Sequence, residues 1–183
     1  MRHKNQRVGI FVDVQNLYHS AKHLYQARVN FSQLIKFLVD GRQLIRAIAY
    51  VVKSDPLIGE AFRLKDKRVI SKSPEASFFE ALEKSGMDLR VKDLQIFPGG
   101  VKKADWDVGL AVDAIRMASF LDVVILVTGD GDFVPLVDYL KWGLGRQVEV
   151  ASFGRSTSAK LKEAADLYID LDDNPKILLG KRE

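Results

Sequence analysis

Hydrophobic positions along the chain follow two different patterns. Apolar runs of strand length occur at residues 7–12 and 122–128, and residues 44–52 and 147–152 are predicted as further strands. Apolar residues with helical spacing occur at residues 16–27, 31–38, 73–84, 105–120, 133–142 and 156–165. A strand buried on both faces is apolar throughout, whereas a helix packed on a sheet shows an apolar stripe. The alternation therefore predicts an α/β sandwich with a mainly parallel central sheet.

Three further segments complete this prediction. Residues 87–97 alternate apolar and polar side chains, which indicates a strand or hairpin arm near a sheet edge, and residues 167–171 indicate a short last strand. Residues 53–73 lack periodicity and are expected to form a long basic loop. The 183 residues suit one domain, which we assign to residues 1–171, and residues 172–183 are expected to be a C-terminal tail with no clear partner.

Composition narrows the range of functions. The sequence has no cysteine, which excludes disulfides, thiolate zinc sites and a cysteine nucleophile. No apolar run approaches the roughly 18 residues that a membrane-spanning helix needs. We therefore expect a cytoplasmic protein without a membrane partner. The formal net charge of +4 permits an anionic partner such as nucleic acid but does not require one.

Carboxylates stand where an open α/β sheet binds ligands, at the carboxyl ends of strands. Asp13 follows the first predicted strand, with Asn16 three residues further on. Asp130 and Asp132 follow a later strand, and Asp107 opens the helix before that strand. Each residue also has a structural interpretation, because Asp and Asn cap helices and Gly-Asp pairs form turns.

As a set, these carboxylates suggest a metal site. Like charges brought together destabilise a fold unless a cation or protonation neutralises them. The ions Mg²⁺ and Mn²⁺ prefer oxygen ligands, and two of them about 4 Å apart can stabilise the attacking and leaving oxygens of a phosphoryl displacement. We therefore expect one or two Mg²⁺ or Mn²⁺ ions. Asp113 lies about 120° around the helix from Asp107, so it either reaches this site from one side or lies on a solvated face.

Three sequence blocks together resemble a known family. They are VGIFVDVQNLY (8–18), KKADWDVGLAVDA (102–114) and VTGDGDFVPLV (127–137). In this order they resemble the NYN domain, specifically its LabA-like branch within the PIN-like nuclease group, over roughly residues 7–171. The resemblance implies a PIN-like three-layer α/β/α sandwich and a metal-dependent ribonuclease that hydrolyses RNA phosphodiesters.

The resemblance also assigns roles to particular residues. The acidic positions of the family match Asp13, Asp107, Asp113, Asp130 and Asp132. Asp13, Asp107 and Asp130 would hold the metal, with Asp132 as a ligand or a supporting carboxylate. Asn16 matches the family's asparagine and would orient a water, a phosphate or Asp13 itself. Thr128 replaces a serine of the family and keeps its hydroxyl group.

Basic residues provide candidate contacts to an RNA backbone. They are Arg63, Lys65, Lys67, Arg68, Lys102, Lys103 and Arg155. Those in the loop at 53–73 fit a solvated surface segment equally well. The expected partner is single-stranded RNA, and because PIN-like domains often pair, a homodimer is also open.

Three other functions fit parts of the sequence. An RNA-binding or regulatory module could keep the acidic pocket with weak or no turnover, and a cleavage assay distinguishes it from a nuclease. A phosphatase of the aspartyl-phosphate type usually has a second aspartate two residues after the first, where this chain has Gln15. A dinucleotide-binding domain requires G-x-G-x-x-G after the first strand, which this sequence lacks.

Overall fold

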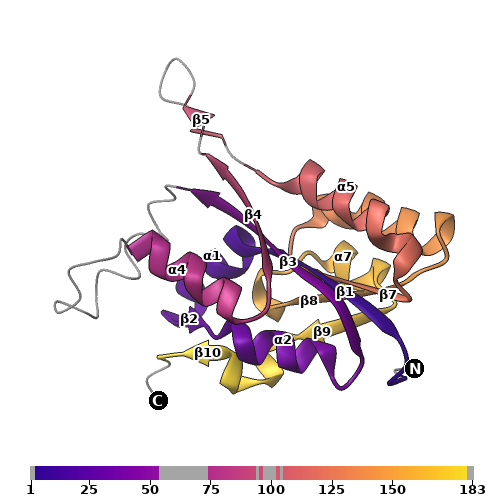
Figure 1. Ribbon diagram of the computed structural model, residues 1–183, viewed down its shortest axis with the longest axis horizontal. Helices are drawn as coiled ribbons and strands as arrows, with labels where there is room; N and C mark the ends of the chain where they lie inside the picture. Colours follow the sequence, from indigo (N-terminus) through magenta and orange to yellow (C-terminus); the bar gives the residue numbers. More distant parts are fainter. Residues whose placement is uncertain (1–2, 54–73, 94, 97–101, 104, 181–183) are drawn as a thin grey trace.

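A six-stranded sheet forms the centre of the protein (Figure 1). The computed structural model describes residues 3–53, 74–93, 95–96, 102–103 and 105–180. In spatial order the strands are β4 (Asp88–Asp93), β3 (Gln43–Lys53), β1 (Arg7–Asp13), β7 (Val123–Val127), β8 (Gln147–Ser152) and β9 (Leu167–Asp170). Every neighbouring pair is parallel, which confirms the prediction of a mainly parallel sheet.

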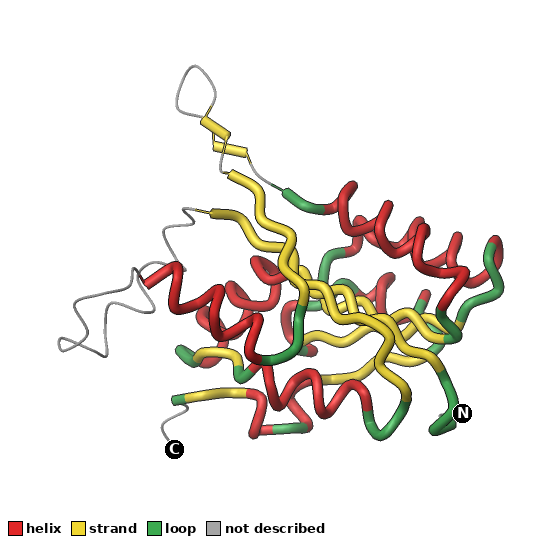
Figure 2. Tube along the Cα trace, in the orientation of Figure 1, coloured by secondary structure: helices red, strands yellow, loops and turns green. Residues whose placement is uncertain are grey.

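Helices cover both faces of this sheet (Figure 2). One layer consists of α1 (Val14–Tyr25), α2 (Phe31–Val39) and α4 (Pro74–Lys84), and the other of α5 (Asp107–Met117), α6 (Val134–Asp138) and α7 (Ala159–Ala164). Because successive strand residues point to opposite faces, Ile10 and Val12 of β1 enter the core under the first layer, whereas Phe11 enters the core under the second. The predicted α/β/α sandwich is thus confirmed.

Short helical turns extend or replace the ends of several predicted helices. They are η1 (Ala118–Phe120), η2 (Gly131–Phe133), the π-helix η3 (Tyr139–Gly143), η4 (Gly154–Ser156), η5 (Leu171–Asp173) and η6 (Pro175–Ile177). The predicted helix at 133–142 is therefore three segments of different winding. Pro135 stands in the first turn of α6, where proline is favoured, and Gly143 is the last residue of η3.

The C-terminal segment differs from the expectation of a tail without a partner. Strand β10 (Leu178–Leu179) pairs antiparallel with β2 (Arg28–Val29). The side chain of Ile177 is fully buried, and its carbonyl accepts a hydrogen bond of 2.7 Å from the backbone N–H of Asn30. That expectation is therefore wrong for the described residues 172–180. A two-residue strand is too short to give a periodic signal in the sequence.

The segment at 87–97, predicted as a strand or a hairpin arm, contains an edge strand and one arm of a hairpin. Strand β4 is an edge strand of the main sheet, and β5 (Gln95–Ile96) pairs antiparallel with β6 (Lys102–Lys103). Figure 1 shows the β5–β6 arm extending beyond β4 before the chain enters α5. The expected basic loop lies outside the described residues from position 54 onwards. In the described part of the chain, no helix has the length and apolarity needed to cross a membrane.

Candidate metal centre at the carboxyl edge of the sheet

The strand order places the predicted acidic residues next to one another. From β1 the sheet extends to β3 on one side and to β7 on the other, so the connections leave β1 and β7 in opposite directions. A crevice opens at such a switch point beyond the carboxyl ends of the strands. Asp13 ends β1, and the turn at residues 128–132 follows β7, so the two lie on either side of this point.

Hydrogen bonds hold the carboxylate of Asp13 in place. Asp13 is the N-cap of α1, and its Oδ1 accepts the backbone N–H of Asn16 at 3.1 Å. Its Oδ2 accepts the hydroxyl of Thr128 at 3.2 Å. The capping interpretation and the site interpretation therefore both apply to Asp13, because one oxygen caps the helix while the other faces the β7 turn.

The surroundings of Asp13 disfavour its negative charge. Burial, and less strongly the charges of Asp107 and Asp130, raise the pKa of Asp13 to about 6, against the lowering effect of its two hydrogen bonds. Asp107 and Asp130 therefore each lie within electrostatic reach of Asp13. The structure thus brings together residues from β1, the start of α5 and the turn after β7.

Thr128 links two of these carboxylates and is more important than the sequence suggested. Its side chain is buried, and its hydroxyl accepts the backbone N–H of Asp130 at 3.2 Å while donating to Asp13. The sequence showed only that a hydroxyl stands at this position. The available signal was a threonine directly after a fully apolar strand. Such a position is expected to be buried, and buried hydroxyl groups are almost always hydrogen-bonded.

Asn16 holds the β7 turn in place. Its side-chain Oδ1 accepts the backbone N–H of Gly129 at 2.9 Å. Its backbone N–H also donates to Oδ1 of Asp13, as the backbone of most residues at this cap position would, so the predicted roles of the Asn16 side chain towards a water, a phosphate or Asp13 stay predictions. The α1 helix and the turn after β7 are therefore connected through one amide side chain.

Close packing leaves little space for a Cβ atom at either glycine of the turn. A Cβ atom on Gly129 would lie 2.8 Å from the carbonyl oxygen of Ser156, and one on Gly131 would lie 2.8 Å from Oγ of Ser158. Neither glycine has a positive φ. The segment after β8 also donates the Ser158 backbone N–H to the Gly129 carbonyl at 2.9 Å. This packed segment was not predicted to support the site.

Asp130 and Asp132 occupy different environments. Oδ1 of Asp130 accepts the backbone N–H of Asp132 at 2.9 Å and so caps the turn η2. Asp130 is half-buried beside Asp13, whereas Asp132 is exposed. The position of Asp132 fits a supporting carboxylate better than a direct partner of Asp13.

Asp113 contacts a different set of residues. Its Oδ2 accepts the hydroxyl of Tyr50 at 3.0 Å and Nε of Arg90 at 3.3 Å, and its Oδ1 lies 3.9 Å from Nη1 of Arg116. The structure therefore places Asp113 among cations on the flank of α5.

The basic residues predicted to bind RNA are placed only in part. Arg63, Lys65, Lys67 and Arg68 lie outside the described residues, as do the side chains of Lys102 and Lys103, whose backbone forms β6. Arg155 is exposed on η4, in the segment that packs against the β7 turn. It therefore lies on the same edge of the sheet as the carboxylates.

The residues at this edge suit a hydrated divalent cation. Asp13, Asp107 and Asp130 offer hard oxygen ligands, and a cation would relieve the repulsion that raises the pKa of Asp13. Among the described residues, no three His, Cys, Asp or Glu side chains are close enough to form a complete ligand set. Mg²⁺ keeps several waters and is usually bound through one or two carboxylates, so it does not need a complete set of protein ligands.

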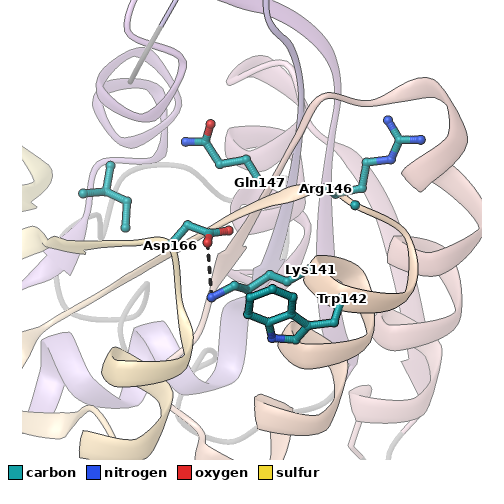
Figure 3. A pocket seen from close by; sticks show the side chains of 7 residues that line it. Lys141, Trp142, Arg146, Gln147 and Asp166 are labelled. Atoms are coloured by element: carbon teal, nitrogen blue, oxygen red, sulfur yellow. Dashed lines mark ion pairs between the residues drawn. The ribbon is translucent and has the colours of Figure 1, made fainter.

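A pocket lies at the opposite edge of the sheet, and Figure 3 shows its lining residues. It encloses about 600 Å³ between the end of η3 and the starts of β8 and β9, and its lining includes Trp142, Arg146 and Asp166. Trp142 is 82% exposed, and Nζ of Lys141 lies 3.2 Å from Asp166. Because these residues stand at the amino ends of the strands, the pocket is separate from the acidic site.

A parallel α/β/α sandwich with carboxylates at the carboxyl edge beside its central strand is the architecture expected of the PIN-like class. Residues 7–172 match the model of the NYN domain, and the chain belongs to the NYN domain family. Membership of this family indicates an RNA-related function. The family resemblance seen in the three sequence blocks is thus confirmed.

Two individual proteins are similar over nearly the whole chain. The Low amplitude and bright protein LabA of Synechococcus elongatus is 23% identical over 184 residues, which cover 94% of this chain and 88% of LabA. A crystal structure of a protein of unknown function from Vibrio parahaemolyticus is 29% identical, with a TM-score of 0.81, and the match covers 98% of this chain and 99% of that one.

Proposed function

We propose that this protein is a metal-dependent ribonuclease that hydrolyses phosphodiester bonds of single-stranded RNA. The observation that carries the proposal is the shielded carboxyl group of Asp13, whose pKa is raised to about 6 beside Asp107 and Asp130. Like charges gathered in this way are destabilising unless a cation or a proton neutralises them, and a cation would do so at neutral pH. Perturbed carboxyl groups at a ligand-binding edge of a sheet are characteristic of functional sites.

Each residue of the site has a distinct task in this proposal. Asp13, Asp107 and Asp130 would hold one or two Mg²⁺ or Mn²⁺ ions. Asp132 would be a supporting carboxylate on the exposed side of the metal site. When bound, such an ion stabilises the charge that develops on the phosphoryl group and lowers the pKa of a coordinated water. Thr128 keeps the Asp13 carboxylate turned towards the β7 turn, and Asn16 fixes the backbone of that turn.

Arg155 supplies a cation for the RNA backbone in this proposal. It is exposed on the same edge of the sheet as the carboxylates. An arginine can bind a phosphate through two parallel hydrogen bonds, which positions the backbone without reading the base. We expect Lys102 and Lys103 to contribute from the β5–β6 arm.

The second candidate function is an RNA-binding or regulatory module with a weak or inactive pocket. It is favoured by the absence of a complete ligand set of three acidic or histidine side chains in the described ranges. A site that binds a hydrated ion loosely would turn over slowly while still binding RNA. The two candidates therefore differ in cleavage rather than in affinity.

The test is cleavage of end-labelled single-stranded RNA with Mn²⁺, with Mg²⁺ and with EDTA. We expect the wild type to cleave only with metal and Asp13→Asn and Asp130→Asn to lose cleavage. The matched control is Asp138→Asn, which removes one negative charge at an exposed position of α6. Equal cleavage by the wild type and both site variants would reject the proposal, and RNA binding without cleavage would favour the second candidate.

A further inference from the structure

A groove between α5 and the edge strand β4 is lined by arginines. It encloses about 220 Å³, and its lining residues are Arg46, Ile48, Arg90, Asp113, Arg116, Met117 and Phe120. We call this site the α5–β4 groove. On this face of the sheet, the side chains of α5 pack with Ile48 and Tyr50 of β3, and Asp113 of α5 contacts Arg90 of β4.

The cations of the groove face solvent, while one of its carboxylates lies beneath them. The side chains of Arg90 and Arg116 are 52% and 75% exposed, whereas that of Asp113 is 17% exposed. Arg46, 54% exposed, is paired at 2.7 Å with Asp88, which is about equally exposed. The groove thus has three guanidinium groups and two nearby carboxylates. Because Asp113 is the better shielded of the two carboxylates, it contributes least to the exposed charge of the groove.

Asp113 explains how the guanidinium groups are held. It accepts Nε of Arg90 at 3.3 Å while the hydroxyl of Tyr50 fixes the same carboxylate oxygen at 3.0 Å. Among the described residues, this bond engages only Nε of Arg90. The two Nη groups of Arg90 therefore remain available for a bidentate contact to an anion, which is how arginine binds phosphate.

Phe120 adds an aromatic surface to the same groove. Its side chain is 61% exposed at the end of η1. A phenylalanine this exposed contributes little to the core and offers a ring on which a base can stack. Proteins that bind single-stranded nucleic acid combine a positively charged groove with such aromatic platforms.

The α5–β4 groove lies in the same layer as the acidic site. Tyr50 on β3 is the register partner of both Asp13 on β1 and Arg90 on β4. Arg90 and Asp13 are therefore two strands apart, about 10 Å between backbones. Lys92 points to the same face of β4 two residues on, with Nζ 5.7 Å from the ring centroid of Trp106, and so extends the row of cations towards the start of α5.

We propose that the α5–β4 groove binds the RNA strand beyond the cleavage site, with phosphates on Arg90 and Arg116 and a base stacked on Phe120. The inference rests on the proposed function for the class of ligand. The groove gives the enzyme affinity for a strand of several nucleotides, independently of the metal. Asp113 acts as a positioning residue for the arginines rather than as a metal ligand.

The test measures binding of a labelled, unstructured single-stranded RNA by fluorescence anisotropy in EDTA, where no cleavage occurs. We expect Arg116→Glu and Phe120→Ser each to weaken binding about tenfold, because the first replaces attraction to a phosphate with repulsion and the second removes a base stack. Neutralising Arg90 and Arg116 together should lower the slope of log affinity against log salt by about 0.7 for each phosphate that the protein no longer neutralises.

Matched controls carry the same changes elsewhere on the surface. Lys36→Glu alters an exposed cation of α2, in the opposite layer, and Trp142→Ser removes an exposed aromatic at the amino edge. We expect both controls to bind RNA as the wild type does. Because the groove side chains are exposed, thermal unfolding should show that all four single variants remain folded.

The outcomes separate the groove from the nuclease. Weakened RNA binding by the groove variants alone supports the groove, even if the wild type never cleaves RNA. Cleavage by the wild type with unchanged affinity of the groove variants would overturn the groove and leave the nuclease standing. Absence of RNA binding, equal loss in the controls, or loss of a homodimer at unchanged RNA affinity would also overturn it, the last by assigning the groove to a protein contact.

Discussion

The hydroxyl of Thr128 donates a hydrogen bond of 3.2 Å to Oδ2 of Asp13, across the boundary between β7 and β1. The two residues are 115 positions apart in the sequence. The same hydroxyl accepts the Asp130 backbone N–H, so one buried oxygen fixes both walls of the acidic site. The stability of this site and its affinity for metal should therefore depend on Thr128.

Replacing Thr128 with valine should expose this dependence. Thr128→Val keeps the shape but leaves Asp13 Oδ2 and the Asp130 N–H without their partner, which should cost about 1–3 kcal/mol of unfolding free energy. Denaturant unfolding at neutral pH measures the change. Thr128→Ser keeps the hydroxyl and is the control. If the valine and serine variants were equally stable, the hydroxyl would contribute nothing to this link.

The raised pKa of Asp13 predicts how stability changes with pH. Between its ordinary value of 3.8 and its value of about 6, the folded state holds the proton more often than the unfolded state. The free energy of unfolding should therefore fall as pH rises through this window and level off above it, by at most about 3 kcal/mol from this group.

Asp13→Asn isolates this contribution because asparagine caps a helix but does not ionise. The difference in unfolding free energy between wild type and Asp13→Asn should move in favour of the variant from about pH 4 to about pH 6. Denaturant titrations at several pH values give this difference, in which other titrating groups cancel. A difference that does not vary with pH would contradict the raised pKa.

The close packing around the β7 turn predicts unequal effects of two alanine substitutions. The new Cβ in Gly129→Ala meets the backbone carbonyl of Ser156, which cannot move easily, so we expect a loss of about 1–3 kcal/mol. The new Cβ in Gly131→Ala meets the side chain of Ser158, which can rotate, so the loss should be smaller. Thermal unfolding of both variants checks the order, and the reverse order would contradict the packing argument.

Metal-induced stabilisation should distinguish the two acidic positions of α5. A metal that binds only the folded protein raises its melting temperature. We expect Mn²⁺ to stabilise the wild type and Asp113→Asn to a similar extent, and Asp107→Asn much less, since Asp107 lies near Asp13 whereas Asp113 lies among arginines. Differential scanning fluorimetry with and without Mn²⁺ measures the shifts. A loss of stabilisation in Asp113→Asn would return this residue to the metal site.

A buried ion pair ties the two halves of the sheet together. Arg42 and Glu149 form two bonds of 2.8 and 3.0 Å, and both side chains are almost fully buried. Removing one partner leaves an uncompensated buried charge, so Arg42→Leu or Glu149→Leu should each cost about 3–5 kcal/mol. The double variant should recover much of this loss, which denaturant unfolding of the four proteins of the cycle would show.

The architecture could be predicted from the sequence because strands and helices have different spacings of apolar residues along the chain. Strand β7, Val123–Val127, is apolar throughout because helices cover both faces of the sheet, and the helix at 31–38 shows an apolar stripe because only one side of it is buried. Asp13 and Asp130 could likewise be placed at one edge, because parallel strands end together. These inferences need only the spacing of neighbours along the chain.

Other features could not be predicted because they depend on the register of distant segments. Asp113 had two possible positions on its helix until the neighbouring strands placed Tyr50 and Arg90 beside it. The pairing of Arg42 with Glu149 joins residues 107 positions apart, and no local pattern marks either one.

The acidic edge of the sheet also combines features that could be predicted from the sequence with features that could not. By itself the sequence determined which residues carry carboxylates and which strands they follow. Only the tertiary structure decided that a hydroxyl and an amide connect them and that the segment after β8 leaves no room for a Cβ at Gly129. Periodicity records whether a side chain is buried, whereas the identity of its partner is set by strand register and by the packing of helices on the sheet.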